Sequence, residues 1–222
     1  MSYQIAIDGP AGAGKSTIAR RVAKEKGFIY VDTGAMYRAM AYYLLQEKAD
    51  PSNEEEISEK CMKAHITIEY QEGEQVVLLN GKNVNPVLRT EEVGNMASAT
   101  SRNKRVRERL TQLQKELAEK NSVVMDGRDI GTCVLPGANV KVYLTASVAV
   151  RAKRRFDELT AKGETCDIGK IEDDIKKRDE QDMKREIAPL KQAEDAVLVD
   201  SSDMSIDEVV KKILSLTEEQ GR

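Results

Sequence analysis

The feature that most constrains this chain is residues 9–16, which follow an apolar run at 5–7 and fit the pattern G-x-x-x-x-G-K-[ST]. This arrangement predicts a buried strand, a glycine-rich turn and the start of a helix. Because glycine adopts positive φ freely, the backbone of the turn can approach a ligand closely, and its N–H groups can form an anion nest. A helix beginning at Ser16 adds the positive end of its dipole. The segment therefore predicts a phosphate-binding loop.

Two side chains of this loop carry chemistry. Lys15 supplies a mobile positive charge for the β- and γ-phosphates of a nucleotide, and the Ser16 hydroxyl is a ligand type for Mg²⁺. The alternative is a glycine-rich turn that matches the pattern by chance. The context argues against that alternative, because an apolar strand precedes the loop and an amphipathic helix follows it, with apolar residues at Ile18, Ala19, Val22 and Ala23.

Composition limits the class of protein. The chain has 222 residues, a formal net charge of -3 and 33% charged residues, so it can form one large domain, or a core with an inserted piece. No apolar run approaches the ~20 residues of a membrane span, and no signal pattern opens the chain. Cys61, Cys133 and Cys166 lack metal-ligand spacing, so reduced thiols and a cytoplasmic location are expected. The single histidine, His65, precedes an alternating strand and is interpreted as structural.

Apolar runs alternate with helical patterns along most of the chain, which predicts an α/β fold with a five-stranded, mostly parallel sheet flanked by helices. Four of the five strands end in polar motifs. Since parallel strands present their carboxyl ends at one edge, where α/β sheets bind ligands, these motifs should gather there. They are the phosphate-binding loop, Asp32-Thr33, residues 126–129 and residues 200–202.

One stretch departs from this alternation. Period-two alternation at 66–70, an apolar run at 76–79 and the pair Asn80-Gly81 predict a small antiparallel β-meander. We therefore expect a core of residues 1–62 and 100–222, with residues 63–99 inserted. Capping boxes are predicted at Ser52 with Glu55 and at Ser205 with Glu208, and the first helix should end at Gly27.

Basic residues cluster on several predicted helices. In the helix predicted over 103–120, cations crowd the first half, where they oppose the helix dipole, and the apolar stripe is Val106, Leu110, Leu113 and Leu117. These cations are either a solvated face or an anion site. Several basic clusters beside a phosphate-binding loop favour a kinase with two anionic substrates. Residues 153–170, basic at their start and containing Gly163 and Gly169, are predicted to form a helical lid that excludes water.

The sequence resembles the bacterial cytidylate kinase family, within the nucleoside monophosphate kinase group of P-loop proteins. The matching segments run over nearly the whole chain in the family's order. They are residues 5–17 (IAIDGPAGAGKST), 30–38 (YVDTGAMYR), 88–93 (LRTEEV), 105–109 (RVRER), 125–132 (MDGRDIGT), 178–189 (RDEQDMKREIAP) and 199–202 (VDSS). The resemblance implies transfer of the γ-phosphoryl group of ATP to CMP or dCMP with Mg²⁺, and an inserted monophosphate-binding segment.

The resemblance also implies roles for individual residues. The ATP phosphates would contact Gly9, Pro10, Ala11, Gly12, Ala13, Gly14, Lys15, Ser16 and Thr17, with Ser16 at the metal and with Ser201 and Ser202 near adenine. The acceptor ribose would contact Thr33, Arg178 and Asp182, its phosphate Arg38, Arg89 and Arg128, and its cytosine Ser98, Arg107 and Asp129. The catalytic set would be Lys15 and Arg128 with the arginines that close on the transferred group, namely Arg154, Arg155, Arg178 and Arg185. Cytosine offers an amino donor to Asp129, while its O2 and N3 accept from Arg107 or Ser98.

Two other functions compete with this interpretation. Another small-molecule P-loop kinase, of the adenylate or shikimate type, is disfavoured by the Arg107 and Asp129 pair and by the meander. A nucleotide-dependent switch or RNA-binding protein is disfavoured by the net charge of -3 and by only two Phe and no Trp, which leave no stacking platform. The expected partners are ATP and CMP or dCMP, with no nucleic acid, no membrane and a monomeric chain.

Overall fold

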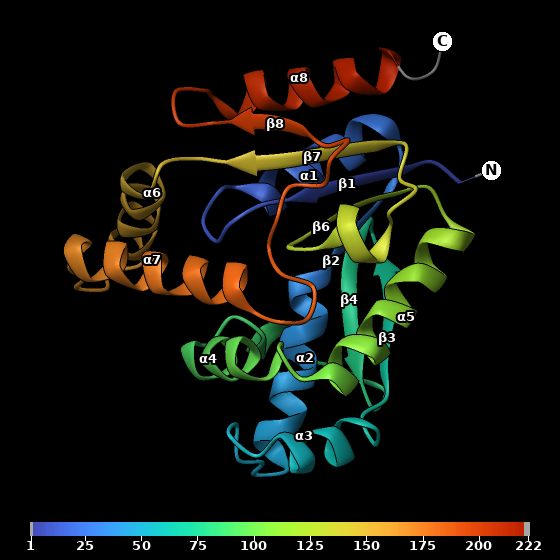
Figure 1. Ribbon diagram of the computed structural model, residues 1–222, viewed down its shortest axis with the longest axis vertical. Helices are drawn as coiled ribbons and strands as arrows, with labels where there is room; N and C mark the ends of the chain where they lie inside the picture. The colour runs from blue at the N-terminus through green and yellow to red at the C-terminus, as the bar shows by residue number, and fades with distance from the viewer. Residues whose placement is uncertain (1, 220–222) are drawn as a thin grey trace. The chain divides into compact units, whose positions relative to one another are not determined.

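The computed structural model describes residues 2–219 of the chain (Figure 1). Its elements in chain order are β1 (Gln4–Asp8), α1 (Lys15–Lys26), β2 (Ile29–Asp32), α2 (Thr33–Gln46), α3 (Glu54–Cys61), β3 (Ile66–Gln71), β4 (Glu74–Leu79), β5 (Lys82–Asn83), η1 (Asn85–Val87), α4 (Glu91–Thr100), α5 (Lys104–Lys120), β6 (Val123–Gly127), η2 (Ile130–Val134), β7 (Val140–Thr145), α6 (Val148–Ala161), α7 (Ile168–Lys184), β8 (Val197–Asp200) and α8 (Ile206–Glu219).

The main sheet has five strands in the order β2-β6-β1-β7-β8, which confirms the predicted fold class. β1 pairs in parallel with β6 and β7, so that Asp8 lies opposite Gly127 on one side and Tyr143 on the other. The apolar runs of β1 and β6 are fully buried, as expected for a parallel sheet covered on both faces. The carboxyl ends of these strands therefore share one edge.

Contacts divide the described chain into two compact units. The first comprises residues 3–28 and 123–219, and the second comprises residues 29–122. In the first unit, β7 pairs with β8, helix α1 packs on β6 and on α8, and α6 and α7 lie side by side (Figure 1). No helix of residues 2–219 is long and apolar enough to cross a membrane.

The second unit contains the antiparallel sheet β3-β4-β5 and helices α2 to α5. Asn80 and Gly81 join β4 to β5 with φ of 50 and 79 degrees, which confirms the hairpin predicted at this pair. Helix α2 packs on β4 and on α4, and α3 packs on α5. The segment predicted as an insertion, 63–99, lies within this unit, and its status as a separate domain stays a prediction.

Two of the three predicted helix-end signals are confirmed. Gly27 ends α1 in the left-handed region with φ of 65 degrees. At the start of α8, the Ser205 backbone N–H donates to Glu208 Oε2 at 2.8 Å and the Glu208 N–H donates to Ser205 Oγ at 3.3 Å. The capping box at Ser52 is wrong. Asp50 accepts from both the hydroxyl and the amide of Ser52, so Asn53 caps α3 instead.

The buried face of α5 also differs in part from the predicted stripe. Val106 and Leu110 are buried as predicted, whereas Leu113 and Leu117 are only partly buried. Gln114 and Ala118 take the buried positions, so the buried face follows every fourth residue from 106 to 118. The shift places one polar side chain in the interior of the second unit.

Candidate active site

The phosphate-binding loop of the first unit joins β1 to α1. Gly9 has φ of 150 degrees, and a Cβ at this position would lie 1.9 Å from the carbonyl oxygen of Leu144 in β7, so only glycine fits there. Gly14 caps α1 in the left-handed region, and the helix begins at Lys15, one residue earlier than expected. The first N–H groups of α1 therefore lie at the carboxyl end of β1, as an anion site requires.

Lys15 is the buried cation of this loop, with 6% of its surface exposed. Its Nζ donates a hydrogen bond to the carbonyl oxygen of Pro10 at 2.7 Å. Burial, followed by the nearby Arg128 guanidinium, lowers the pKa of Lys15, while Asp126 and Asp8 act in the opposite direction. A polyphosphate bound in the loop would supply the negative charge that favours the protonated ammonium.

Ser16 and Asp126 form the part of the site that fits a metal ion. Ser16 Oγ donates to Asp126 Oδ2 at 3.0 Å, and Asp126 is a buried residue of β6. Hydroxyl and carboxylate oxygens suit Mg²⁺, which binds proteins through one or two such groups and keeps water and phosphate oxygens as its other ligands. No group of three or more His, Cys, Asp or Glu side chains suited to a metal occurs among residues 2–219. The sequence prediction did not include Asp126 in this site, although its place in a strand-end polar motif was the available signal.

Asp8 anchors the turn that follows β6. Its carboxylate accepts from the backbone N–H of Ile130 at 2.8 Å and of Gly131 at 2.7 Å. Burial raises the pKa of Asp8 to about 6; the two hydrogen bonds and Lys15 oppose this rise, and the Asp129 charge adds to it. Asp8 directly precedes the phosphate-binding loop, so it joins that loop to the turn carrying Arg128 and Asp129. No sequence pattern predicts this role for Asp8.

Four of the predicted site residues form one charged cluster in the first unit. Arg128 Nε donates to Asp182 Oδ2 at 2.8 Å, and Arg185 Nη2 donates to Asp129 Oδ1 at 3.4 Å. Arg185 also lies 3.8 Å from Asp182 through its Nη1. The side chains of Asp129 and Arg185 are buried, and Arg178 is an exposed residue of α7, the helix that carries Asp182. The two arginines and two carboxylates thus come from the β6–η2 turn and from α7 with its C-terminal cap.

Ser201 and Ser202, predicted near adenine, lie close to one of the two α6 arginines that were predicted to contact the transferred phosphoryl group. Arg154 Nη2 donates to the Ser201 carbonyl oxygen at 2.8 Å, so α6 contacts the loop after β8. Ser202 Oγ donates to Asp200 Oδ1 at 2.6 Å and accepts from the backbone N–H of Ser147 at 2.9 Å. Arg155 instead pairs with Glu158 of its own helix at 3.0 Å and is exposed. The structure therefore brings Arg154 to Ser201 and leaves Arg155 on the surface of α6.

Thr33 and Arg38 belong to the second unit, at the start of α2. Thr33 is buried directly after Asp32, whose side chain caps the helix by accepting from the Ala35 N–H at 2.8 Å. Arg38 Nη2 donates to Asp32 Oδ2 at 3.3 Å, and its buried Nε has no hydrogen-bond partner among the described residues. Gln75 of β4 holds the backbone of Asp32 with both atoms of its amide, a contact that strand alternation did not reveal. An unsatisfied guanidinium N–H favours an anionic ligand at this place.

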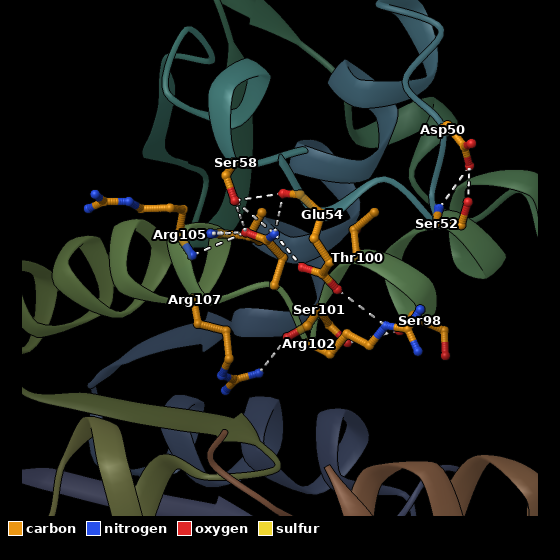
Figure 2. Close-up of polar contacts among 12 residues, drawn as sticks. Asp50, Ser52, Glu54, Ser58, Ser98, Thr100, Ser101, Arg102, Arg105 and Arg107 are labelled. Carbon is orange, nitrogen blue, oxygen red and sulfur yellow. Dashed lines mark hydrogen bonds and ion pairs between the residues drawn. The ribbon is translucent and has the colours of Figure 1, made fainter. Parts of the chain in front are cut away.

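Arg107 differs from the other cations of its basic run (Figure 2). Its Nη1 donates to the Ser101 carbonyl oxygen at 2.9 Å, and its guanidinium carbon lies 5.4 Å from the ring centroid of Tyr37. Arg107 is buried, whereas the exposed Arg102 and Arg105 pair with Glu54 at 3.8 Å and with Glu108 at 3.3 Å. The exposed Arg102 and Arg105 thus belong to a solvated face, whereas Arg107 is enclosed and the half-buried Arg109 donates to the Ala64 carbonyl oxygen. The two remaining predicted residues are the half-buried Ser98 of α4 and the exposed Arg89 before α4.

Known proteins are similar to this chain over nearly its whole length. The cytidylate kinase family model matches residues 5–219. A cytidylate kinase from Caldicellulosiruptor bescii is 50% identical over 212 residues, covering 96% of this chain and 94% of that protein. A cytidylate kinase from Bacillus cereus is 50% identical over 214 residues with the same coverage.

Solved structures show the likeness of fold alone. A protein from Eubacterium ventriosum has a TM-score of 0.55 at 14% identity over 99% of both chains. A shikimate kinase from Bacteroides thetaiotaomicron has a TM-score of 0.51 at 15% identity, over 97% of this chain and 98% of that one. The evidence of sequence is far more specific: with a family model matched across nearly its whole length and relatives at 50% identity, the chain belongs to the cytidylate kinase family.

Proposed function

We propose that this protein transfers the γ-phosphoryl group of ATP to CMP or dCMP, giving ADP and CDP or dCDP. The observation that carries the proposal is the phosphate-binding loop with its buried Lys15, in a chain of the cytidylate kinase family. The charged cluster of Arg128, Asp129, Asp182 and Arg185 in the same unit supplies the second set of groups that such a reaction needs.

On the donor side, residues 9–17 bind the ATP phosphates through backbone N–H groups, and the Lys15 ammonium exchanges the Pro10 carbonyl for phosphate oxygens. Arg128, Arg154, Arg178 and Arg185, with Arg155 from the lid at 153–170, neutralise the charge that spreads over the transferred group. Ser16 and Asp126 are the residues that would hold Mg²⁺, which would supply further neutralisation of the phosphate charge. Ser201 and Ser202 border the adenine.

On the acceptor side, Arg38 and Arg89 bind the phosphate of CMP together with Arg128, and the unsatisfied Nε of Arg38 supports this role. Thr33, Arg178 and Asp182 bind the ribose. Ser98, Arg107 and Asp129 bind cytosine. Residues 63–99 serve as the monophosphate-binding segment, and the enzyme works as a cytoplasmic monomer.

The direct test measures ADP release in a coupled assay at a fixed ATP concentration. The acceptors are CMP, dCMP, UMP, AMP and shikimate. We expect rapid turnover with CMP and dCMP and slow ADP release without an acceptor. Rapid turnover with AMP or shikimate and not with CMP would assign a different kinase. Equal, slow ADP release with and without every acceptor would favour a nucleotide-dependent switch.

Specificity for cytosine is tested at Asp129. A carboxylate that accepts from the cytosine amino group meets a carbonyl lone pair when uracil binds, a mismatch worth about 1–3 kcal/mol. Asp129→Ala should therefore lower kcat/KM for CMP far more than for UMP. The competing role is that Asp129 only braces Arg185, whose Nη2 donates to it at 3.4 Å. In that case Asp129→Ala lowers kcat/KM equally for CMP and for UMP, and it lowers the thermal midpoint of the apo protein.

A further inference from the structure

Helix α7 presents two carboxylates, three residues apart, to arginines from different parts of the first unit. Asp182 accepts from Arg128, in the turn after β6, at 2.8 Å. Asp179 lies 2.7 Å from Nη2 of Arg151, which belongs to α6. Residues three apart on a helix share a face, so one face of α7 contacts both the β6–η2 turn and α6.

Arg151 joins three segments through its buried guanidinium. Its Nε donates to the carbonyl oxygen of Ala146 at 2.9 Å, and its Nη1 donates to the carbonyl oxygen of Ala11, in the phosphate-binding loop, at 2.9 Å. The stem of Arg151 also packs against the loop, because a Cβ at Gly12 would lie 3.3 Å from the Cβ of Arg151. With Asp179 as its third partner, Arg151 connects the backbone of the donor loop to helix α7.

The Arg151–Asp179 pair is a costly way to stabilise a fold. Arg151 and Asp179 are 4% and 8% exposed, and Oδ1 of Asp179 is buried with no hydrogen-bond partner among the described residues. A buried ion pair with an unsatisfied oxygen is often no more stable than a well-packed apolar pair of similar volume. The other ion pairs of α7 that lie within the helix, such as Glu180 with Lys184, are exposed. The position of the Arg151–Asp179 pair therefore calls for an explanation other than stability.

We propose that Arg151 and Asp179 are positioning residues that fix the donor loop at Ala11 in register with helix α7. The same helix carries Arg178 and Asp182, and Arg185 follows at its C-terminal end, so the pair sets the donor phosphates relative to the groups that serve the acceptor and the transferred phosphoryl. Misplacement of reacting groups by ~1 Å costs on the order of 10²-fold in rate. This inference rests on the proposed function for its kinetic test.

The first variant is Asp179→Asn, with Glu180→Gln as its matched control on the neighbouring, exposed residue. Asp179→Asn leaves the loop N–H groups and the bond from Arg151 to Ala11 in place, so the Kd of ATP without CMP should change by less than about threefold. At saturating ATP and CMP, kcat should fall at least about tenfold, because the variant still binds ATP but no longer fixes the donor loop relative to α7. Glu180→Gln should stay within about twofold of wild type in both quantities, since it removes only a surface pair.

A second variant is needed in case Asp179→Asn does not fold. Removing one partner of a buried ion pair leaves the other charge buried and unpaired, which strongly destabilises the protein. Arg151→Met combined with Asp179→Leu removes both charges and keeps the buried volume. We expect a thermal midpoint near that of wild type with kcat still at least about tenfold lower. A folded double variant whose kcat lies within about twofold of wild type would overturn the proposal.

A third readout does not depend on turnover. If the pair transmits the state of the loop, an ATP analogue should slow amide exchange within residues 176–184 of α7 in wild type and in Glu180→Gln, and not in Asp179→Asn. Equal slowing in all three proteins overturns the proposal. Should wild type show no CMP-dependent ADP release, the proposed function fails, and this exchange measurement still decides the role of the pair.

Discussion

The side chain of Lys15 shows how single residues of the site are held ready for a ligand. Its ammonium is buried, and the hydrogen bond it donates goes to a neutral carbonyl, that of Pro10. The same burial that lowers the pKa of Lys15 also strengthens its attraction to an incoming phosphate, because little water separates them. The charge is therefore placed where it acts on a ligand more than on the fold.

Replacing Lys15 tests this interpretation. Lys15→Ala should lower kcat by roughly 10²-fold or more, the loss typical of removing one charge-stabilising group, while the apo protein unfolds at or above the wild-type temperature. Steady-state kinetics and thermal unfolding measure both effects. The control is Lys24→Ala at the exposed end of the same helix, which should leave kcat unchanged. Turnover near wild type in Lys15→Ala would remove Lys15 from the catalytic set.

Asp8 gives the pH dependence of stability a defined sign. Burial raises its pKa to about 6 in the folded protein, so the folded state binds a proton more tightly than the unfolded chain does. The stabilisation from this proton is fully present below about pH 4, the ordinary aspartate pKa, and is lost as the pH rises through about 6. The charged groups that act on the Asp8 carboxylate are Asp129, which raises its pKa, and Lys15, which lowers it.

We therefore expect the free energy of unfolding of wild type to fall relative to that of Asp8→Asn between pH 4 and pH 6, by up to about 3 kcal/mol. Asparagine keeps a carbonyl oxygen that accepts from one of the two backbone N–H groups. Urea unfolding of both proteins at several pH values measures the difference. A difference that stays constant across this range would show that Asp8 does not titrate there.

At the scale of elements, the buried side-chain amide of Asn103 links two helices of the second unit. Asn103 caps α5 by accepting from the N–H groups of Arg105 at 3.1 Å and Val106 at 3.2 Å. Its Nδ2 donates to the Glu54 carbonyl oxygen and to Ser58 Oγ, both at 3.0 Å, in α3. The start of α5 is thus fixed to the neighbouring helix through one side chain.

Substituting the two N-cap residues should lower the free energy of unfolding by different amounts. Asn103→Ala removes the cap of α5 and also the hydrogen bonds from Nδ2 to Glu54 and to the half-buried Ser58, so it should lower the free energy of unfolding by about 2–3 kcal/mol. Asn53→Ala removes only an exposed cap, that of α3, and should cost about 1 kcal/mol. Urea unfolding of both variants gives the comparison. Equal losses would mean that the bonds from Asn103 to α3 contribute little.

The same elements show what local sequence decides. The hairpin at Asn80 and Gly81 was predictable because its turn requires positive φ at both residues. The cap of α3 was not, because Asp50, Ser52 and Asn53 compete for the same backbone groups and their geometry chooses among them. The burial of Gln114 was also not predictable, because tertiary packing, and not the spacing of apolar residues in the sequence, decides which row of α5 side chains faces inward.

At the scale of the whole molecule, family membership and fold were predictable because the motifs recur in order along the sequence, and comparison confirms both. The hydrogen bonds of Asp8, Gln75, Asp126 and Arg151 could not be predicted from the sequence. Each of these side chains bonds a partner far along the chain: Asp8 and Ile130, for example, are separated by 122 residues. Such hydrogen bonds form only after the sheet and the helices have assembled, so no local sequence pattern predicts them.

The segment predicted as a lid, residues 153–170, contains weakly held cations and a connection between two helices. Residues 162–167 join α6 to α7. Arg155 and Lys162 are held near them only by surface pairs with Glu158, which are worth about 0–1 kcal/mol each. Phosphate oxygens of a bound nucleotide would replace such a weak partner at little cost, since they form stronger, charge-assisted bonds with arginine.

We therefore expect amide exchange across residues 153–170 to slow with an ATP analogue plus CMP more than with either ligand alone, because both anionic ligands attract the cationic start of the segment, Lys153, Arg154 and Arg155. Exchange followed by mass spectrometry, on samples whose occupancy is verified by calorimetry, measures this. Residues 206–218 of α8 serve as the internal reference, because no site residue lies on that helix. If both ligands are bound and exchange over 153–170 is unchanged, water must be excluded by another part of the protein, and Arg155 loses its proposed role at the transferred phosphoryl group.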